Sequence, residues 1–159
     1  MHYVTLEEIR KEYNISRLFQ QHWGSLEMDT SKGIYHIDHL KGFSAIEEGE
    51  IKGLLTYAVE SGHIEIISLD SFEENKGIGT ELLRVLENHT KTLQLSILQL
   101  ITTNDNLYAL CFYQKRGYRI KGIVRDGVIE ARKRKPSIPM IAKNGIPIYD
   151  ELLLEKKLD

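Results

Sequence analysis

The stretch "ENKGIGTELL", residues 74–83, decides the fold. It places two glycines, Gly77 and Gly79, just ahead of a helical apolar pattern, and the β-branched run "IEIISL" (residues 64–69) comes shortly before them. The first turn of a helix carries unpaired N–H groups and the positive end of the helix dipole, and glycines let an anion approach them closely. The stretch therefore predicts a strand-to-helix turn that either cradles a phosphate or is a tight turn without a ligand.

Bulk composition excludes several classes of protein. A chain of 159 residues with 42% hydrophobic and 28% charged residues predicts one globular domain, residues 1–159. The formal net charge of −2 gives no reason to expect nucleic acid as a partner. One cysteine, Cys111, excludes an internal disulfide, and neither a signal segment nor an apolar run of about 20 residues is seen. We expect a cytoplasmic protein without a membrane partner.

The pattern of apolar residues changes along the chain between the periods of a strand and of a helix. Thr5 and Glu8 have the spacing of a capping box, so a helix is expected to begin near Leu6. Further helices are expected around residues 16–23, from residue 78 and at 104–117, and strands at 43–48, 51–59, 63–69, 96–102, 118–125 and 150–158. This order predicts an α/β (α+β) domain with one mixed, mostly antiparallel sheet, a β–α–β crossover and flanking helices.

A second motif lies in the predicted helix after the crossover, in "NLYALCFYQKRGY" (residues 106–118). Together with "NKGIG" it resembles the GNAT superfamily of acyl-CoA N-acyltransferases, over roughly residues 43–125. The GNAT helix motif is matched at Asn106, Ala109, Tyr113, Gly117 and Tyr118. The phosphate-loop glycines match at Gly77 and Gly79, whereas Glu74 stands where the family usually has Gln or Arg. The segments "TTNDN", "KPSIP" and "GIPIYDE" also look like those of a group of bacterial GNAT proteins of unassigned substrate.

The resemblance implies acetyl-CoA as cosubstrate and no metal. The pyrophosphate would be held by the loop and first helical turn, namely Asn75, Lys76, Gly77, Ile78, Gly79 and Thr80. Lys76 would add a point charge. Glu74 would oppose an anion, unless its side chain points to solvent, where charges are screened.

The family chemistry is direct attack by an amine on the thioester in a ternary complex. On that resemblance, Tyr113 would protonate the departing thiolate; the alternative is a core aromatic residue. A backbone N–H near Leu69 would stabilise the thioester oxygen, on the resemblance alone. Asn106 would bind the pantetheine arm or an ordered water, and capping the helix is an equal alternative.

The residues suggest more than one general base. Strand alternation places His63, Glu65 and Ile67 on one face of the predicted strand. His63 and Glu65 can each accept a proton from an ammonium, although a histidine beside a turn is more often simply solvated. Glu65 lies deeper in the strand, where a carboxylate needs a partner or a function. Asp70, at the strand end, is a further candidate.

Two later segments are open to more than one interpretation. The basic run "ARKRK" (residues 131–135) fits a solvated helix face, or a contact with an acidic substrate or with the coenzyme's extra phosphate. Residues 135–149 contain all three prolines and fit either a lid over the acceptor site or a surface loop with rigid turns. The histidines around residues 22–39 are too scattered for a metal site.

These observations favour an N-acetyltransferase that acts on a primary amine of a small molecule or peptide. The alternatives are a GNAT-like sensor that binds an acyl-CoA without turnover and, less favoured, a dimerisation module without a ligand. A homodimer is compatible with each interpretation. The acceptor stays undetermined, because loops build acceptor pockets in this fold.

Overall fold

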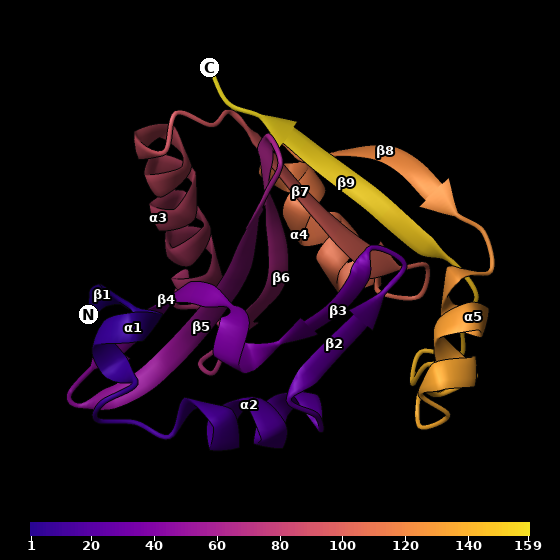
Figure 1. Cartoon of the computed structure of the whole chain (residues 1–159), viewed down its shortest axis with the longest axis horizontal. Helices are drawn as coiled ribbons and strands as arrows, with labels where there is room; N and C mark the ends of the chain where they lie inside the picture. Colours follow the sequence, from indigo (N-terminus) through magenta and orange to yellow (C-terminus); the bar gives the residue numbers. More distant parts are fainter. The chain divides into compact units, whose positions relative to one another are not determined.

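The structure, a computed structural model, describes all 159 residues. Seven strands form one mixed sheet, mostly antiparallel, and the element order β6–α3–β7 gives the expected β–α–β crossover (Figure 1). The predicted α/β fold class is therefore confirmed. Contacts within the chain group it into two compact units, residues 1–28, 35–98 and 158–159 in the first and residues 29–34 and 99–157 in the second. The two units are described in turn.

Four antiparallel strands and the longest helix dominate the first unit. The strands are, in sheet order, β1 (His2–Thr5), β4 (Lys41–Glu47), β5 (Glu50–Glu60) and β6 (His63–Ser71). The helices are α1 (Leu6–Ile9), α2 (Ile15–Trp23), the 3₁₀ turn η1 (Ile37–His39) and α3 (Ile78–Thr92). A separate two-stranded sheet consists of β2 (Glu27–Thr30) and β3 (Gly33–His36), and the tip of this hairpin belongs to the second unit. The strands predicted at 43–48, 51–59 and 63–69 are thus β4, β5 and β6, which form an antiparallel meander.

Local signals set the helix ends in the first unit. The Thr5 side chain accepts a hydrogen bond from the Glu8 N–H at 3.2 Å, and the Glu8 carboxylate accepts from the Thr5 N–H at 2.8 Å. This is the predicted capping box. Asn14 caps α2 through the Arg17 N–H, and Gly24 ends α2 with a φ of 69°, a left-handed conformation that suits glycine.

Strand β5 separates two layers of side chains. A Cβ added to Gly53 would lie 2.5 Å from the Ile78 side chain, so this face of β5 packs closely under α3. The next residue, Leu54, points to the opposite face, where it belongs to a buried cluster with Leu6 and Phe19 of α1 and α2. Helix α3 therefore covers one face of these strands, and α1 and α2 cover the other.

The second unit contains the end of the sheet and two helices. Its elements are β7 (Ile97–Thr103), α4 (Leu107–Lys115), β8 (Arg119–Val124), α5 (Gly127–Arg134) and β9 (Glu151–Lys157), with strand order β7-β9-β8. Strands β8 and β9 pair antiparallel. The first two residues of β7 belong to the first unit.

Several elements differ from the sequence-based expectation. Strands β1, β2 and β3 and helix α5 were not predicted, because each is short and its apolar pattern is weak. Helix α3 ends at Thr92, and the next residue, Leu93, is exposed. Leu107 and Cys111 of α4 are both exposed, although their side chains are apolar. None of the helices is both long and apolar enough to span a bilayer.

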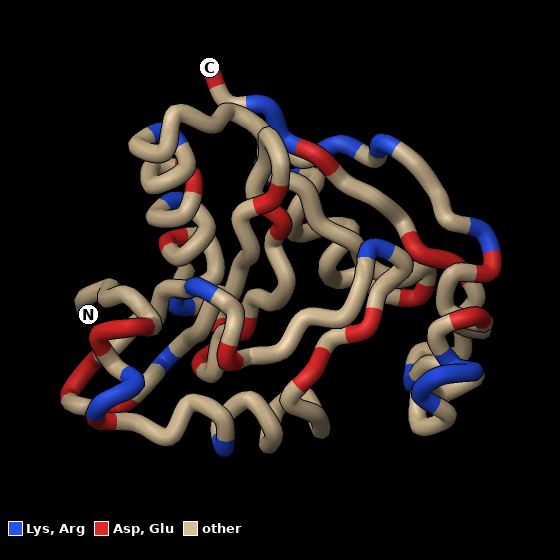
Figure 2. Tube along the Cα trace, viewed as in Figure 1, with Lys and Arg blue, Asp and Glu red and all other residues tan.

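The basic run is part of α5, where Figure 2 shows a group of Lys and Arg residues. The Arg132 guanidinium donates to the carbonyls of Ile138, Pro139 and Ile148 at 2.7–3.0 Å. Arg134 forms two hydrogen bonds with the Asp29 carboxylate, each 2.9 Å long. The interpretation as a solvated face therefore fits Lys133, whereas Arg132 and Arg134 hold the second unit together.

Candidate functional site

Strand β6 carries a row of polar side chains on the face opposite α3. In the register of β5 and β6, Thr56 faces Ser68 while the next residue, Tyr57, faces Ile66, so Ile67 is an extra residue that forms a β-bulge. The bulge brings Ser68 onto the face that also presents Glu65, although the two are three residues apart. The Thr56 and Ser68 hydroxyls form a short hydrogen bond on this face.

Glu65 is the most deeply buried carboxylate of this face. Glu65 is only 2% exposed, and its Oε1 lies 3.1 Å from Nε2 of His63. His63 is less buried and stands at the start of the strand, next to the turn. A buried carboxylate is costly without a partner, and the histidine supplies one. The predicted shared face of His63 and Glu65 is therefore confirmed, and the two form a hydrogen-bonded pair.

Asp70 is a second acidic group on the same face, since it faces Leu54 across the ladder. The Trp23 indole N–H donates to its carboxylate at 2.9 Å. Burial raises the pKa of Asp70 above its usual value, and the indole hydrogen bond and the nearby His22 oppose this shift. A carboxylate with a raised pKa is closer to the proton affinity that a general base needs near neutral pH.

A third carboxylate, that of Glu60, completes the row and was not predicted. Glu60 faces His63 across the ladder and accepts a hydrogen bond from the Tyr35 hydroxyl at 3.1 Å. The pKa of Tyr35 is strongly raised, first by burial, then by this hydrogen bond and by the charges of Glu60 and Glu65. The negative potential of both carboxylates thus reaches one hydroxyl. This arrangement suits a positively charged group, such as the ammonium of an amine.

The position of Glu60 opposite His63 can be predicted from the spacing of these residues in the sequence. A two-residue turn, Ser61–Gly62, separates Glu60 from His63, so the hairpin pairs these two residues directly. Tyr35 and Trp23, in contrast, come from distant segments with no such spacing.

The glycine loop leads into α3 with the backbone geometry that the motif requires. Asn75 and Gly77 have φ values of 59° and 70°, in the left-handed region, and Gly77 caps α3 without a side-chain hydrogen bond. The first backbone hydrogen bond of α3 runs from the Glu81 N–H to the Gly77 carbonyl. The N–H groups of the first turn come before this bond in the chain and have no acceptor within the helix. Ile78 turns its side chain into the core. The loop thus leads into a helix N-terminus of the kind that binds phosphate.

The charged side chains around this loop are placed at the surface. Glu74 and Lys76 are exposed, and so is Asn75. Glu73 pairs with Lys52, which also binds Glu50, at 2.7 and 2.9 Å. Glu74 therefore has the solvent exposure that limits its repulsion of an anion.

The remaining predicted site residues lie on other elements. Leu69 faces Leu55 in the β6 ladder, just past the bulge, and Thr80 lies in the first turn of α3 with Gly79. Asn106 caps α4 by accepting from the Ala109 N–H at 3.1 Å, which is the structural alternative stated for it.

Tyr113 lies on α4 in the second unit. It is buried, with its ring edge-to-face against Phe112 and Tyr118 at centroid distances of 5.1 and 5.4 Å. Phe112 is less buried and carries the Arg116 guanidinium 3.7 Å above its ring. Tyr113 is therefore the aromatic residue of this pair that faces inward.

Residues 135–149 form a pinned loop. Ile141 and Pro147 make a β-bridge, and the Asn104 side chain bonds the Pro147 carbonyl and the N–H groups of Tyr149 and Asp150. These bonds fix the shape of the segment in the second unit. Met140 and Ile141 remain exposed at 71% and 61%.

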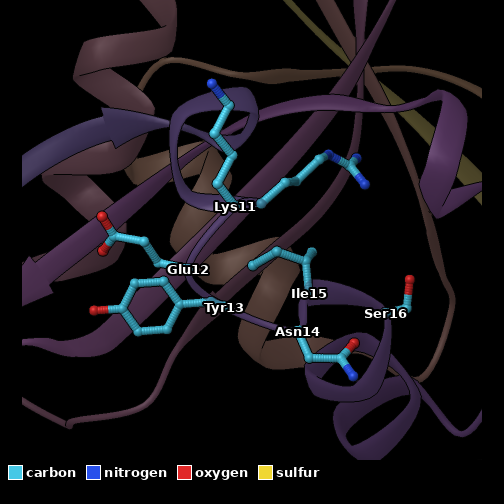
Figure 3. A pocket seen from close by; sticks show the side chains of 7 residues that line it. Lys11, Glu12, Tyr13, Asn14, Ile15 and Ser16 are labelled. Atoms are coloured by element: carbon cyan, nitrogen blue, oxygen red, sulfur yellow. The ribbon is translucent and has the colours of Figure 1, made fainter.

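A cavity of about 420 Å³ lies at the turn between α1 and α2, lined by residues 10–16 (Figure 3). The labelled side chains point in different directions instead of toward one centre. Tyr13 donates to the Gly49 carbonyl at 2.6 Å, and Arg10 donates to the carbonyls of Ile37 and Leu40. These groups hold the turn in place, so the cavity shows no convergent chemistry. The structure contains no group of three or more His, Cys, Asp or Glu residues that could hold a metal.

Comparisons with known proteins place this geometry in a family. Residues 5–118 match the family described as Acetyltransferase (GNAT) family. The chain is 52% identical over 145 residues to the uncharacterized protein YxbD of Bacillus subtilis (strain 168), covering 91% of each.

Two solved structures are similar to the chain. One is a GNAT family acetyltransferase from Elizabethkingia anophelis with acetyl-CoA bound, at 26% identity and a TM-score of 0.66, covering 77% of this chain and 78% of the other. The other is a Bacillus subtilis acetyltransferase in complex with CoA, at 19% identity and a TM-score of 0.70, covering 99% of each chain, which shows the fold alone.

Proposed function

The chain belongs to the GNAT family of acetyltransferases, and we propose that it transfers an acetyl group from acetyl-CoA to a primary amine of a small molecule or peptide. The observation that carries the proposal is the buried Glu65–His63 pair on a face with two further carboxylates, Glu60 and Asp70. Such a face attracts an ammonium and offers a base that can remove its proton.

The first unit supports the coenzyme part of the proposal. The turn from Asn75 to Gly77 and the first turn of α3 offer amide donors and a dipole to the pyrophosphate. Lys76 adds a positive charge from the surface. The E. anophelis relative, with acetyl-CoA bound, is consistent with this cosubstrate.

The reaction follows as direct attack. Glu65, directly or through His63 or a water, takes a proton from the ammonium, and the free amine attacks the thioester carbon. A C–N bond forms, the C–S bond breaks, and the coenzyme leaves as a thiolate. Tyr113 gives its proton to this thiolate and regains one, directly or through water, from the attacking nitrogen, which loses its second proton and becomes the amide N–H. A backbone N–H near Leu69 stabilises the oxygen while it carries charge.

Release of free CoA thiol from acetyl-CoA, measured with a panel of amines, tests the proposal. We expect release that depends on the amine and forms the N-acetyl product in equal amount. A protein that binds acetyl-CoA tightly but releases no thiol with any amine would instead be a sensor.

We expect CoA to stabilise the folded protein through the glycine loop. At 100 times Kd, linkage gives about 2.7 kcal/mol, and for a chain of this size Tm should rise by roughly 5–10 °C. Gly79→Asp should abolish this rise, because it adds a side chain and a negative charge where phosphate oxygens approach. The readout is the shift on adding CoA, since the variant itself can be less stable.

Two ligands control for the source of this stabilisation. Dephospho-CoA keeps the pyrophosphate and should retain most of the shift, whereas pantetheine lacks it and should shift Tm far less. Equal shifts with pantetheine and CoA, or a full response of the Gly79→Asp protein, would mean that the loop is only a turn.

We also propose that residues 135–149 contact the acceptor, because this pinned loop exposes the apolar side chain of Met140 near the less exposed Ile138. Changing both to Ala should raise KM for the amine and leave KM for acetyl-CoA within a few-fold. Steady-state kinetics with each substrate varied in turn measures this. Equal effects on both KM values would indicate general destabilisation and contradict the contact.

A further inference from the structure

The first unit contains a cavity where β1 gives way to α1, beside the start of β4. Its volume is about 440 Å³, within the range of small-molecule pockets. Its lining comes from the start of α1, the segment from η1 into β4, one residue of β5 and the last full turn of α3.

Three aromatic side chains pack together at this cavity. The Phe43 and Tyr57 rings stack with centroids 6.0 Å apart, and the His89 ring meets Phe43 edge-on at 5.4 Å and Tyr57 at 6.1 Å. Leu6 and Leu40, both buried, also line the cavity. These rings and leucines form a largely apolar wall with flat surfaces, against which another aromatic ring can pack face-on or edge-on.

Tyr57 brings an unpaired polar group to this wall. The residue is only 3% exposed, yet its hydroxyl makes no hydrogen bond. No fully buried side-chain nitrogen or oxygen in the protein lacks a partner, so the hydroxyl oxygen must be the part of Tyr57 that reaches the cavity. Burial raises the pKa of Tyr57, so the group stays a neutral hydroxyl. A hydroxyl that reaches the cavity and has no protein partner can donate or accept a hydrogen bond with a ligand group there.

Both positively and negatively charged residues line the cavity. Lys41 and Glu7 are exposed, and Asp38 lies 3.5 Å from His36. The Arg10 guanidinium is bound to the carbonyls of Ile37 and Leu40 at 2.8 and 3.2 Å. With two cationic and two acidic residues, the rim has no dominant sign, which favours an uncharged ligand.

The cavity is distinct from the surfaces used in the proposed acetyl transfer. Eleven residues of α3 separate His89 from Ile78 at the glycine loop, about 16 Å at the helical rise. Along β5, the side chain of Tyr57 points to one face of the sheet and those of its neighbours Thr56 and Ala58 point to the other. Thr56 pairs with Ser68 and Ala58 pairs with Glu65, so these residues share the face of the carboxylate row. The Tyr57 side chain at the cavity therefore lies on the opposite face of the sheet from the carboxylate row.

We propose that this cavity binds a small, uncharged aromatic molecule with one hydrogen-bonding substituent. The ring packs against Phe43, Tyr57 and His89, and the substituent bonds the Tyr57 hydroxyl or the His89 imidazole. The site is additional to the acetyl-transfer site and does not depend on that activity.

Phenol is the probe for the test, because it combines one ring with one hydroxyl. Titration of the isotope-labelled full chain with phenol, followed by NMR, should give saturable shifts centred on Phe43, Tyr57 and His89. Cyclohexanol, of similar size but without a flat ring, should bind more weakly. Saturating CoA should leave the phenol shifts in place.

Tyr57→Phe should weaken phenol binding by about 2- to 12-fold, the range for one neutral hydrogen bond, and should keep the fold, because the lost hydroxyl has no protein partner. Tyr3→Phe, a matched change on β1 outside the cavity, should leave the affinity unchanged.

The proposal is overturned by any of three results. Shifts that do not saturate, or that centre elsewhere, would show that phenol does not occupy the cavity. Displacement of phenol by CoA would place it in the coenzyme site. Equal affinity for cyclohexanol would remove the aromatic selectivity. The wild-type titration alone decides the first point if a variant fails to fold.

Discussion

Replacing Tyr113 by Phe is expected to lower kcat by about 10²–10⁴, the usual contribution of a positioned proton donor. The change keeps the ring, and with it the edge-to-face contacts with Phe112 and Tyr118. Only the hydroxyl is lost, and we propose that this hydroxyl protonates the CoA thiolate. Affinity for acetyl-CoA should barely change, because the interaction is made mainly in the transition state.

Tyr108→Phe is the matched control, since Tyr108 lies on the same helix but is 81% exposed. It should leave kcat unchanged. Thioesters of more acidic thiols should be less sensitive to Tyr113→Phe, because their thiolates leave without needing a proton. A Tyr113→Phe kcat within three-fold of the parent at saturating substrates would remove Tyr113 from the mechanism and leave it as a core aromatic residue.

Sequence patterns identified the elements whose signals are local. The Thr5–Glu8 capping box, the meander β4–β6 and the start of α3 at Ile78 each depend on residues a few positions apart. Short-range propensities and caps act at this range, so reading them requires no tertiary information. The same holds for the left-handed turn at Gly77.

Elements that depend on distant partners were not predictable in this way. Strand β1 has only four residues and exists because it pairs with β4, about 40 positions later. Helix α5 begins at Gly127, after the left-handed residue Asp126, which makes no side-chain cap, and Arg132 holds the helix to a later loop. Tertiary contacts outweigh weak local preference in both cases.

In the candidate site, too, features set by local sequence were predictable, and features set by distant contacts were not. Alternation placed His63 and Glu65 on one face, and the register confirms it. Alternation predicts the wrong face for Ser68, because the bulge at Ile67 moves Ser68 to the face of Glu65. The approach of Tyr35 to Glu60 and of Trp23 to Asp70 depends on how α2 and β3 pack, which no spacing in the sequence encodes.

Glu65→Gln is expected to lower kcat by about 10²–10⁴ at neutral pH, because the amide cannot accept the proton of the incoming ammonium. Glutamine has the shape of glutamate and can still bond His63, so the buried site stays filled. The loss should shrink as pH rises toward the pKa of the amine, since more of the acceptor is then already deprotonated. Rate–pH profiles of the parent and the variant with the same amine measure this convergence.

Glu60→Gln is the control on the same face, since Glu60 contributes charge and binds Tyr35. We expect it to raise KM for the amine and change kcat little, because it acts through attraction of the ammonium and not through proton removal. A Glu65→Gln deficit that stays constant across pH would indicate a binding or structural role for Glu65. A Glu65→Gln protein with parental kcat at every pH would move the role of base to His63 or to Asp70, whose pKa burial raises above its usual value.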